Sequence, residues 1–236
     1  MPATPATPHD VVFLFDCDNT LLDNDHVLQD LRKHMTHAFG EQNSTRYWEI
    51  FENLRAELGY ADYLGALQRY RIEHPRDTGL LLMSSFLIEY PFANRLYPGA
   101  LDALRHLATR GPTVILSDGD VVFQPRKLAR SGLWDEVDGR VLIYIHKELM
   151  LDQVMDCYPA RHYVMVDDKL RILSAMKKAW GGNLTTVFPR QGHYAFDPKE
   201  IASNPPADVT VERIGELADI DIDTLVRGAN GQQALT

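Results

Sequence analysis

Residues 11–20 read VVFLFDCDNT, an apolar run that ends in two aspartates separated by one residue. A short run rich in β-branched and aromatic side chains predicts a strand that is buried on both faces. Similar runs recur at 113–116, 141–145, 163–166 and 184–188. Helical patterns lie between them at 100–110, 121–131, 148–157 and 170–180. This alternation predicts a parallel sheet with helices on both faces, whose ligands bind at the carboxyl ends of the strands.

One long interval, residues 24–95, does not follow the alternation. It shows helical spacing without a convincing buried strand. The predicted helices are 28–39, 44–58, 62–72 and 78–89. Ser44 is expected to cap the start of the second helix, and Gly59 to follow its end. The insert therefore predicts a second, smaller helical domain.

The rest of the chain divides around this insert. Residues 10–23 and 96–225 are expected to form the α/β core, including a peripheral strand at 207–211 and a short helix at 214–219. Gly111, Gly132 and Gly181 are expected to end core helices in the left-handed conformation. Residues 1–9 and 226–236 are expected to be flexible or frayed tails.

Composition excludes several classes of protein. Hydrophobic residues make up 45% of the chain and charged residues 24%, as in ordinary globular proteins. The net charge of −9 and the absence of a basic cluster argue against nucleic-acid and membrane-surface partners. No apolar run approaches the ~20 residues of a membrane helix. Cys17 and Cys157, far apart, indicate neither a disulfide scaffold nor a metal site, so we expect a cytoplasmic protein. The sequence leaves open whether it is a monomer or a homodimer.

The two aspartates of the first stretch carry the strongest chemical signal. Asp16 and Asp18 leave a predicted strand two residues apart, so their side chains can point to the same side. Two neighbouring carboxylates repel each other unless a cation lies near them. Mg²⁺ meets that need with oxygen ligands and suits a phosphate substrate. One carboxylate can then attack phosphorus while the other transfers protons to and from oxygen.

The next two strand ends supply hydrogen-bond donors and a positive charge. Ser117, with Asp118 and Gly119 after it, offers side-chain and backbone donors to a phosphoryl oxygen. Lys147 follows the third predicted strand, where its charge would offset the carboxylates and the charge developing on phosphorus. We therefore expect these four residues at the substrate phosphate.

Asp167 and Asp168 follow the fourth predicted strand. Since the carboxyl ends of parallel strands meet at one edge, these carboxylates should lie near Asp16 and Asp18. They supply the remaining acid that a metal site needs.

These motifs together resemble a known superfamily. The segment Asp16-Cys17-Asp18-Asn19-Thr20 is similar to the Asp-x-Asp-x-Thr signature of the haloacid dehalogenase superfamily. Ser117, Lys147 and Asp167-Asp168 resemble its second, third and fourth motifs in the same order. The insert resembles the helical cap of that superfamily. The resemblance covers roughly residues 11–188 and implies a Rossmann-like core with a smaller α-helical cap domain.

The resemblance also implies a role for each acid. Asp16 would form an aspartyl-phosphate, and Asp18 would be the general acid and base. Mg²⁺ would be held by the carboxylates of Asp16 and Asp168 and the backbone carbonyl of Asp18. Asp167 would act through water or through Lys147.

The third motif departs from the family pattern. The segment His146-Lys147-Glu148-Leu149 lacks the proline that often follows this lysine in relatives. Lys127, on the helix predicted at 121–131, is therefore a second candidate for the active-site lysine.

The leading hypothesis is a magnesium-dependent phosphatase acting on a small phosphate monoester. A phosphomutase resembling β-phosphoglucomutase is the first alternative, because it shares the whole catalytic set. A haloacid dehalogenase would need neither Asp18 as a proton donor nor a metal. A non-catalytic binding or regulatory protein would be free to lose acids that this chain retains. The insert holds generic residue types that do not identify the substrate.

Overall fold

The structure, a computed structural model, describes residues 7–226. Its six strands form one parallel sheet in the order β3-β2-β1-β4-β5-β6. They are β1 (His9–Phe15), β2 (Thr113–Asp118), β3 (Val141–Tyr144), β4 (Ala160–Val166), β5 (Leu184–Pro189) and β6 (Val209–Val211). Phe15 pairs with Ile115 on one side and Val166 on the other. This register brings the loops after β1, β2 and β4 to the same edge of the sheet.

Alternate residues of β1 face opposite layers of the core. Phe13 and Phe15 belong to a hydrophobic cluster that includes α5, whereas Val12 and Leu14 belong to one that includes α9. The prediction of a central strand buried on both faces is confirmed. The core helices are α5 (Ala100–Ala108), α6 (Phe123–Ser131), α7 (Leu133–Glu136), α8 (Leu151–Cys157), α9 (Leu170–Trp180), α10 (Pro198–Ser203) and α11 (Ile222–Val226). Short 3₁₀ helices are η2 (Lys147–Leu149), η3 (Gly181–Asn183), η4 (Tyr194–Phe196) and η5 (Ile214–Ala218).

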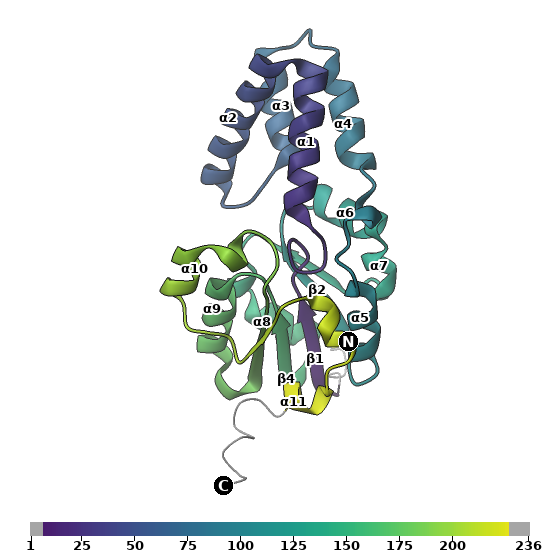
Figure 1. Cartoon of the computed structure of the whole chain (residues 1–236), viewed down its shortest axis with the longest axis vertical. Helices are drawn as coiled ribbons and strands as arrows, with labels where there is room; N and C mark the ends of the chain where they lie inside the picture. The colour runs from purple at the N-terminus through teal and green to yellow at the C-terminus, as the bar shows by residue number, and fades with distance from the viewer. Residues whose placement is uncertain (1–6, 227–236) are drawn as a thin grey trace, which may run out of the picture.

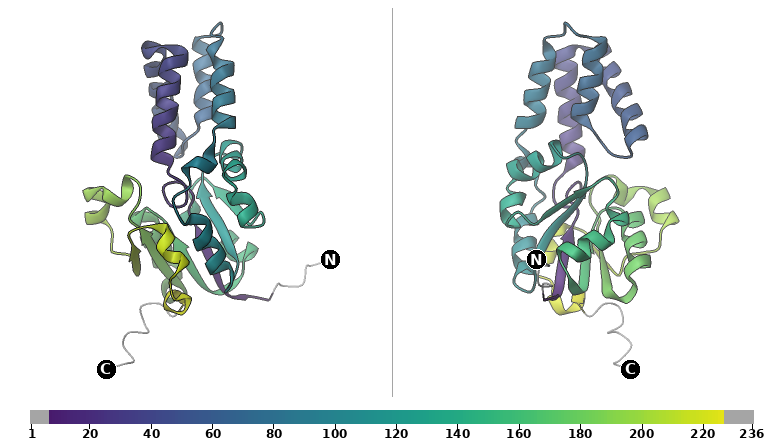
Figure 2. Two further views of the ribbon diagram at one scale, coloured as in Figure 1. Left: turned by 45° about the vertical axis from the view of Figure 1, so that its right-hand side comes forward. Right: turned by 180° about the vertical axis from the view of Figure 1, so that it is seen from behind.

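Four helices between β1 and β2 stand over the carboxyl edge of the sheet as a separate layer (Figure 1, Figure 2), which we call the cap. They are α1 (Asn24–Phe39), α2 (Glu41–Leu58), α3 (Tyr63–Glu73) and α4 (Gly79–Glu89), and η1 (Phe92–Arg95) leads back to the core. Aromatic contacts hold the layer together. The Phe51 and Tyr63 rings stack with centroids 4.7 Å apart, and the Tyr47 hydroxyl donates to the Tyr63 carbonyl.

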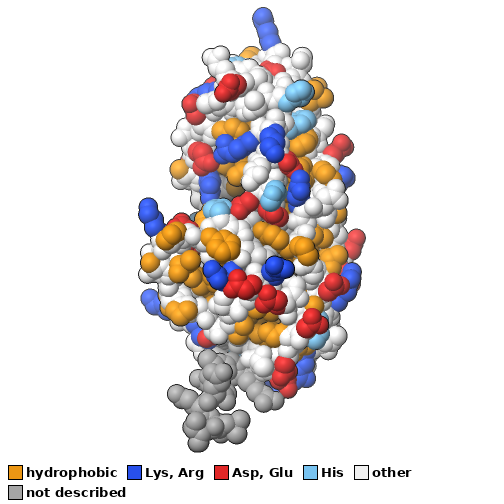
Figure 3. Space-filling view, in the orientation of Figure 1, with side chains coloured by type: hydrophobic (Ala, Val, Ile, Leu, Met, Phe, Trp, Pro, Cys, Tyr) orange, Lys and Arg blue, Asp and Glu red, His pale blue; other side chains and the backbone are white. Residues whose placement is uncertain are grey.

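The surface carries charges of both signs. On the face in Figure 3, Lys and Arg side chains are interspersed with Asp and Glu rather than gathered into one basic patch. Within residues 7–226, no helix is long and apolar enough to cross a membrane.

Three local predictions were wrong. Strand β1 begins at His9, inside the predicted tail, because His9 pairs with Ala160. Ser44 lies inside α2, where it accepts a hydrogen bond from the Thr36 hydroxyl, since Gly40 at φ 77° makes the turn between α1 and α2. Gly111 does not adopt the left-handed conformation and instead packs closely on β1, where a Cβ would lie 2.3 Å from the Val11 carbonyl oxygen.

The C-terminal part was predicted less fully. The strand expected at 207–211 is β6, and the helix expected at 214–219 is the 3₁₀ helix η5. Helices α7, α10 and α11 were not predicted; each is seven residues or shorter. Of the tails predicted at 1–9 and 226–236, residues 1–6 and 227–236 lie outside the described residues, and Val226 is the last residue of α11.

Candidate active site

Asp16 lies directly after β1 and is the most enclosed acid of the first motif, with 2% of its surface exposed. Its carboxylate forms an ion pair with the Lys147 ammonium and accepts a hydrogen bond from the Thr20 hydroxyl at 3.4 Å. Burial alone would raise the pKa of Asp16. The charges of Lys147 and Lys169 outweigh burial, so the pKa lies below its ordinary value. Asp16 is therefore held as a carboxylate, the form that can attack an electrophile.

Asp16 is one of three carboxylates that meet at this edge of the sheet. Ligand atoms of Asp16, Asp167 and Asp168 all lie within 4.8 Å of one another, and all three residues are buried. Asp167 is paired with Lys147, whose Nζ atom lies 2.7 Å from Asp167 Oδ2, although that oxygen accepts no hydrogen bond; the Asp167 Oδ1 atom accepts the Lys169 backbone N–H.

Asp168 is not compensated in this way. Both of its carboxylate oxygens are buried without a hydrogen-bond donor, and Lys169 Nζ stands 3.8 Å away, beyond hydrogen-bond distance. Burial raises the pKa of Asp168 well above its ordinary value, and Lys169 offsets only part of this. A buried carboxylate whose oxygens accept no hydrogen bond is costly, even with Lys169 nearby. The position fits a hard divalent cation, which accepts carboxylate ligands.

Two buried lysines divide the acids of the first motif between them. Lys147 Nζ contacts Asp16 and Asp167 and donates to the Leu116 carbonyl at 3.2 Å. Lys127, with no exposed surface, places Nζ 2.6 Å from Asp18 Oδ1. The lysine that touches Asp16 is therefore Lys147, and Lys127 belongs to Asp18.

Lys127 also connects the core to the cap. Its ammonium donates at 3.0 Å to the side-chain oxygen of Asn24, the first residue of α1. Burial alone would lower the pKa of Lys127, but the charge of Asp18 raises it, and Cys17 and Tyr63 add to the rise. Asp18 and the start of the cap therefore share one fixed positive charge.

The loop after β2 approaches the same place. Ser117 is buried, and its hydroxyl accepts a hydrogen bond from Gln124 Nε2 at 3.0 Å. Asp118 Oδ1 accepts the Lys147 backbone N–H at 2.8 Å. Burial raises the pKa of Asp118 to about 6, with Lys147 opposing the shift. Asp118 and Gly119 line the cavity described next, whereas the Ser117 side chain is engaged with Gln124.

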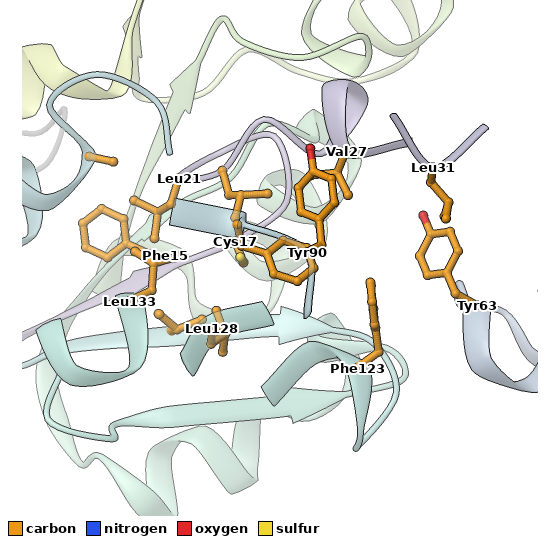
Figure 4. Close-up of a cluster of buried hydrophobic side chains, with 14 of the residues drawn as sticks. Phe15, Cys17, Leu21, Val27, Leu31, Tyr63, Tyr90, Phe123, Leu128 and Leu133 are labelled. Carbon is orange, nitrogen blue, oxygen red and sulfur yellow. The ribbon is translucent and has the colours of Figure 1, made fainter. Parts of the chain in front are cut away.

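Cys17, between the two acids of the first motif, packs into the hydrophobic core. It is fully buried in the hydrophobic cluster of Figure 4, which includes Leu21, Phe123 and Leu128. Burial raises the pKa of its thiol well above the ordinary value, and Asp18 adds to the shift. Cys17 is a packing residue that holds the loop of the first motif against the hydrophobic core.

A cavity of about 240 Å³ lies between the core and the cap. Asp18 and Asn19 border it from the first motif, together with the Lys127 and Lys169 side chains of the core. Further lining residues come from the cap and from the loop after β5: Phe51, Glu52, Arg55, Tyr60, Tyr63, His193 and Tyr194. A molecule in this cavity would contact both layers.

Several of these residues were not predicted from the sequence. Lys169 follows Asp168 directly, and its position after a strand end could have drawn attention to it. Asn24, Gln124 and Tyr194 carry no comparable signal, because only the folded chain brings them to the site.

Comparisons with known proteins agree with this architecture. The family model described as haloacid dehalogenase-like hydrolase matches residues 11–179. A crystal structure described as a haloacid dehalogenase-like hydrolase from Burkholderia xenovorans is 86% identical, with a TM-score of 0.86. The match covers 91% of this chain and 100% of that one.

More distant structures share the fold. A haloacid dehalogenase-like family hydrolase from Xanthomonas campestris is 17% identical at a TM-score of 0.66, covering 98% of this chain and 99% of that one. An L-2-haloacid dehalogenase from Xanthobacter autotrophicus is 19% identical at a TM-score of 0.55, covering 89% and 97%. The comparison with curated proteins gave no match.

Proposed function

The chain belongs to the haloacid dehalogenase-like hydrolases, and from this premise we propose that it is a magnesium-dependent phosphatase acting on a small phosphate monoester. The observation that carries the proposal is the carboxylate of Asp168, which is buried beside Asp16 and Asp167 and accepts no hydrogen bond. A phosphatase of this kind needs a cation there, because the phosphoryl group brings further negative charge to three acids.

The residues present fit Mg²⁺. The carboxylates of Asp16 and Asp168 would hold it together with the backbone carbonyl of Asp18, while Asp167 keeps Lys147 in place. The ion would supply charge neutralisation and orientation for the phosphoryl oxygens. A structure of similar fold, the HAD-hydrolase YfnB from Bacillus subtilis, is described as bound to magnesium; it is 16% identical, with a TM-score of 0.57.

The chain's own side chains then account for each bond. An Asp16 carboxylate oxygen attacks phosphorus, the bond to the alcohol oxygen breaks, and Asp18 gives that oxygen a proton. Asp18 then accepts a proton from a water molecule whose oxygen attacks the phosphorus of the aspartyl-phosphate. This step releases inorganic phosphate and regenerates Asp16. Lys147 stays beside Asp16 throughout and offsets the charge that gathers there.

Asp18 separates this reaction from dehalogenation. Its carboxylate borders the cavity, and Lys127 fixes its position. Displacing a halide from carbon needs no proton donor for the leaving group, whereas releasing an alcohol from phosphate does. The proposal therefore uses an acid that a dehalogenase would leave idle.

The test is phosphate release from a panel of monoesters, with Mg²⁺ or with EDTA. We expect Mg²⁺-dependent release, which Asp16→Asn lowers by about 10⁴-fold or more, the scale on which losing a covalent nucleophile acts. Asp152→Asn, at an exposed position of α8, is the matched control. Chloride release from 2-chloropropionate without phosphatase activity would contradict the proposal. Transfer to a second hydroxyl without phosphate release would make the protein a mutase.

A further inference from the structure

Arg55, near the end of α2, borders the cavity from the cap side with most of its hydrogen-bonding capacity unused. Its Nη2 atom donates to the Tyr194 hydroxyl at 3.0 Å, a neutral partner from the core. The nearest carboxylate, Glu52, stands 3.8 Å away without a hydrogen bond. A guanidinium has five N–H donors, so Arg55 can still bind an anion through two of them.

Two other arginines of the cap, Arg46 and Arg69, differ in this respect. Arg46 binds both oxygens of Glu73 at 2.8 Å, and Arg69 binds both oxygens of Glu57 at 2.8 and 3.0 Å. Neither lines the cavity. The cap arginine that does line it is thus the one whose hydrogen-bonded partner is uncharged.

Tyr194 positions the Arg55 guanidinium. Its hydroxyl accepts the hydrogen bond from Arg55, and Lys169 Nζ lies 5.1 Å from the centre of its ring. Lys169 leans toward Asp168 and so belongs to the acid cluster. Tyr194 therefore contacts both Arg55 and Lys169, the lysine beside Asp168, so a ligand that extends along Tyr194 from the acid cluster would meet the guanidinium.

We propose that Arg55 binds a second anionic group of the substrate, a carboxylate or a second phosphate, at the end remote from the transferred phosphoryl group. This inference rests on the proposed phosphatase function and deepens it. A cavity of about 240 Å³ is small beside most ligand pockets, which supports a short substrate. The substrate class is then a small phosphorylated acid or a small bisphosphate, not a neutral sugar phosphate or a polymer.

The kinetic test uses matched substrate pairs. In 3-phosphoglycerate and glycerol 3-phosphate, a carboxylate replaces a hydroxymethyl group. In 1,3-propanediol bisphosphate and its monophosphate, a second phosphate replaces a hydroxyl. We expect one anion-tailed member to be preferred in kcat/KM by about 10- to 100-fold, the scale of charge-assisted hydrogen bonds. The pair in which this preference is found shows whether the second anionic group is a carboxylate or a phosphate.

Substitution of Arg55 completes the test. Arg55→Gln should remove most of that preference, mainly through KM, and Arg55→Lys should restore part of it because lysine keeps the charge without the fork. Arg69→Gln, which breaks a cap ion pair away from the cavity, should leave the preference intact. Equal rates for both members of each pair, or a preference that survives in Arg55→Gln, would overturn the proposal.

A binding measurement separates this inference from the phosphatase proposal. Asp16→Asn protein with Mg²⁺ is titrated calorimetrically with the same four compounds. Tighter binding of an anion-tailed compound, lost in the Asp16→Asn/Arg55→Gln double variant, supports the anion site even if no compound is hydrolysed. Equal binding of both members of each pair overturns the anion site even if hydrolysis is observed.

Discussion

The acid cluster of the core and the cavity wall of the cap use charge in opposite ways. At the sheet edge, Lys147 is buried and committed to Asp16 and Asp167. In the cap, Arg55 is 46% exposed at its side chain, its hydrogen bond goes to a neutral hydroxyl, and its nearby carboxylate, Glu52, stands 3.8 Å away. Buried, paired charges are rigid and poorly screened, whereas exposed ones can adapt to a ligand. The comparison indicates that the core fixes the reaction and the cap selects what is brought to it.

The largest effect should come from removing the core cation. Lys147→Met leaves two buried carboxylates without their partner, so we expect a loss of about 3–5 kcal/mol in the free energy of unfolding. We expect kcat to fall by at least about 10²-fold, as when one electrostatic group of an active site is removed. Denaturant unfolding and steady-state kinetics measure the two effects.

Two other lysines serve as references. Lys127→Met should destabilise less, because its partner Asp18 is 26% exposed and can be hydrated. Lys33→Met, at an exposed position of α1, should change neither quantity. Equal effects at Lys147 and Lys33 would break the contrast between core and cap.

A smaller effect of opposite sign is expected at Asp168. In EDTA its carboxylate is buried without a donor, so Asp168→Asn should raise the free energy of unfolding by about 1–3 kcal/mol. In Mg²⁺ the order should reverse, since only the wild-type protein gains binding energy from the ion. Thermal melting in EDTA and in a Mg²⁺ series measures both. A Mg²⁺ response of equal size in the two proteins would show that Asp168 is not a ligand.

The sheet was predictable from the sequence, and much of the site's pairing was not. The buried strands can be predicted because each is a continuous apolar run. Their parallel order then brings Asp16, Ser117, Lys147 and Asp168 to one edge of the sheet. Both Lys147 and Lys127 follow the end of a strand in the sequence. Only the folded structure shows that the Lys147 ammonium reaches Asp16 and the Lys127 ammonium reaches Asp18.

The cap shows the same limit. Its helices follow from spacing, but the hydrogen bonds of Arg46 and Arg69 depend on carboxylates three to 27 residues away in the chain, and that of Arg55 depends on the Tyr194 hydroxyl, 139 residues away. The start of α2 was mispredicted at Ser44 because a serine side chain that could cap a helix was instead buried against Thr36.

The smallest expected effect is a pH dependence at Asp118. Its pKa is about 6 in the folded protein, against an ordinary value of 3.8. Between about pH 4 and pH 6 the folded state therefore binds more protons than the unfolded state, and the free energy of unfolding falls as pH rises through that window. Asp118→Asn, which cannot titrate, should reduce this fall in metal-free protein. Denaturant unfolding at pH 4.5, 5.5 and 6.5 measures it, and identical slopes for both proteins would contradict the assignment.

The most direct test of the account is to identify the residue that carries the phosphoryl group. Protein turning over a phosphate monoester with Mg²⁺ is quenched in acid and treated with borohydride, which reduces an acyl phosphate to an alcohol, and the peptides are then analysed by mass spectrometry. The account predicts reduction at Asp16 that requires both ester and Mg²⁺ and is absent from Asp16→Asn. Turnover with an unmodified Asp16, or with reduction at another residue, would contradict it.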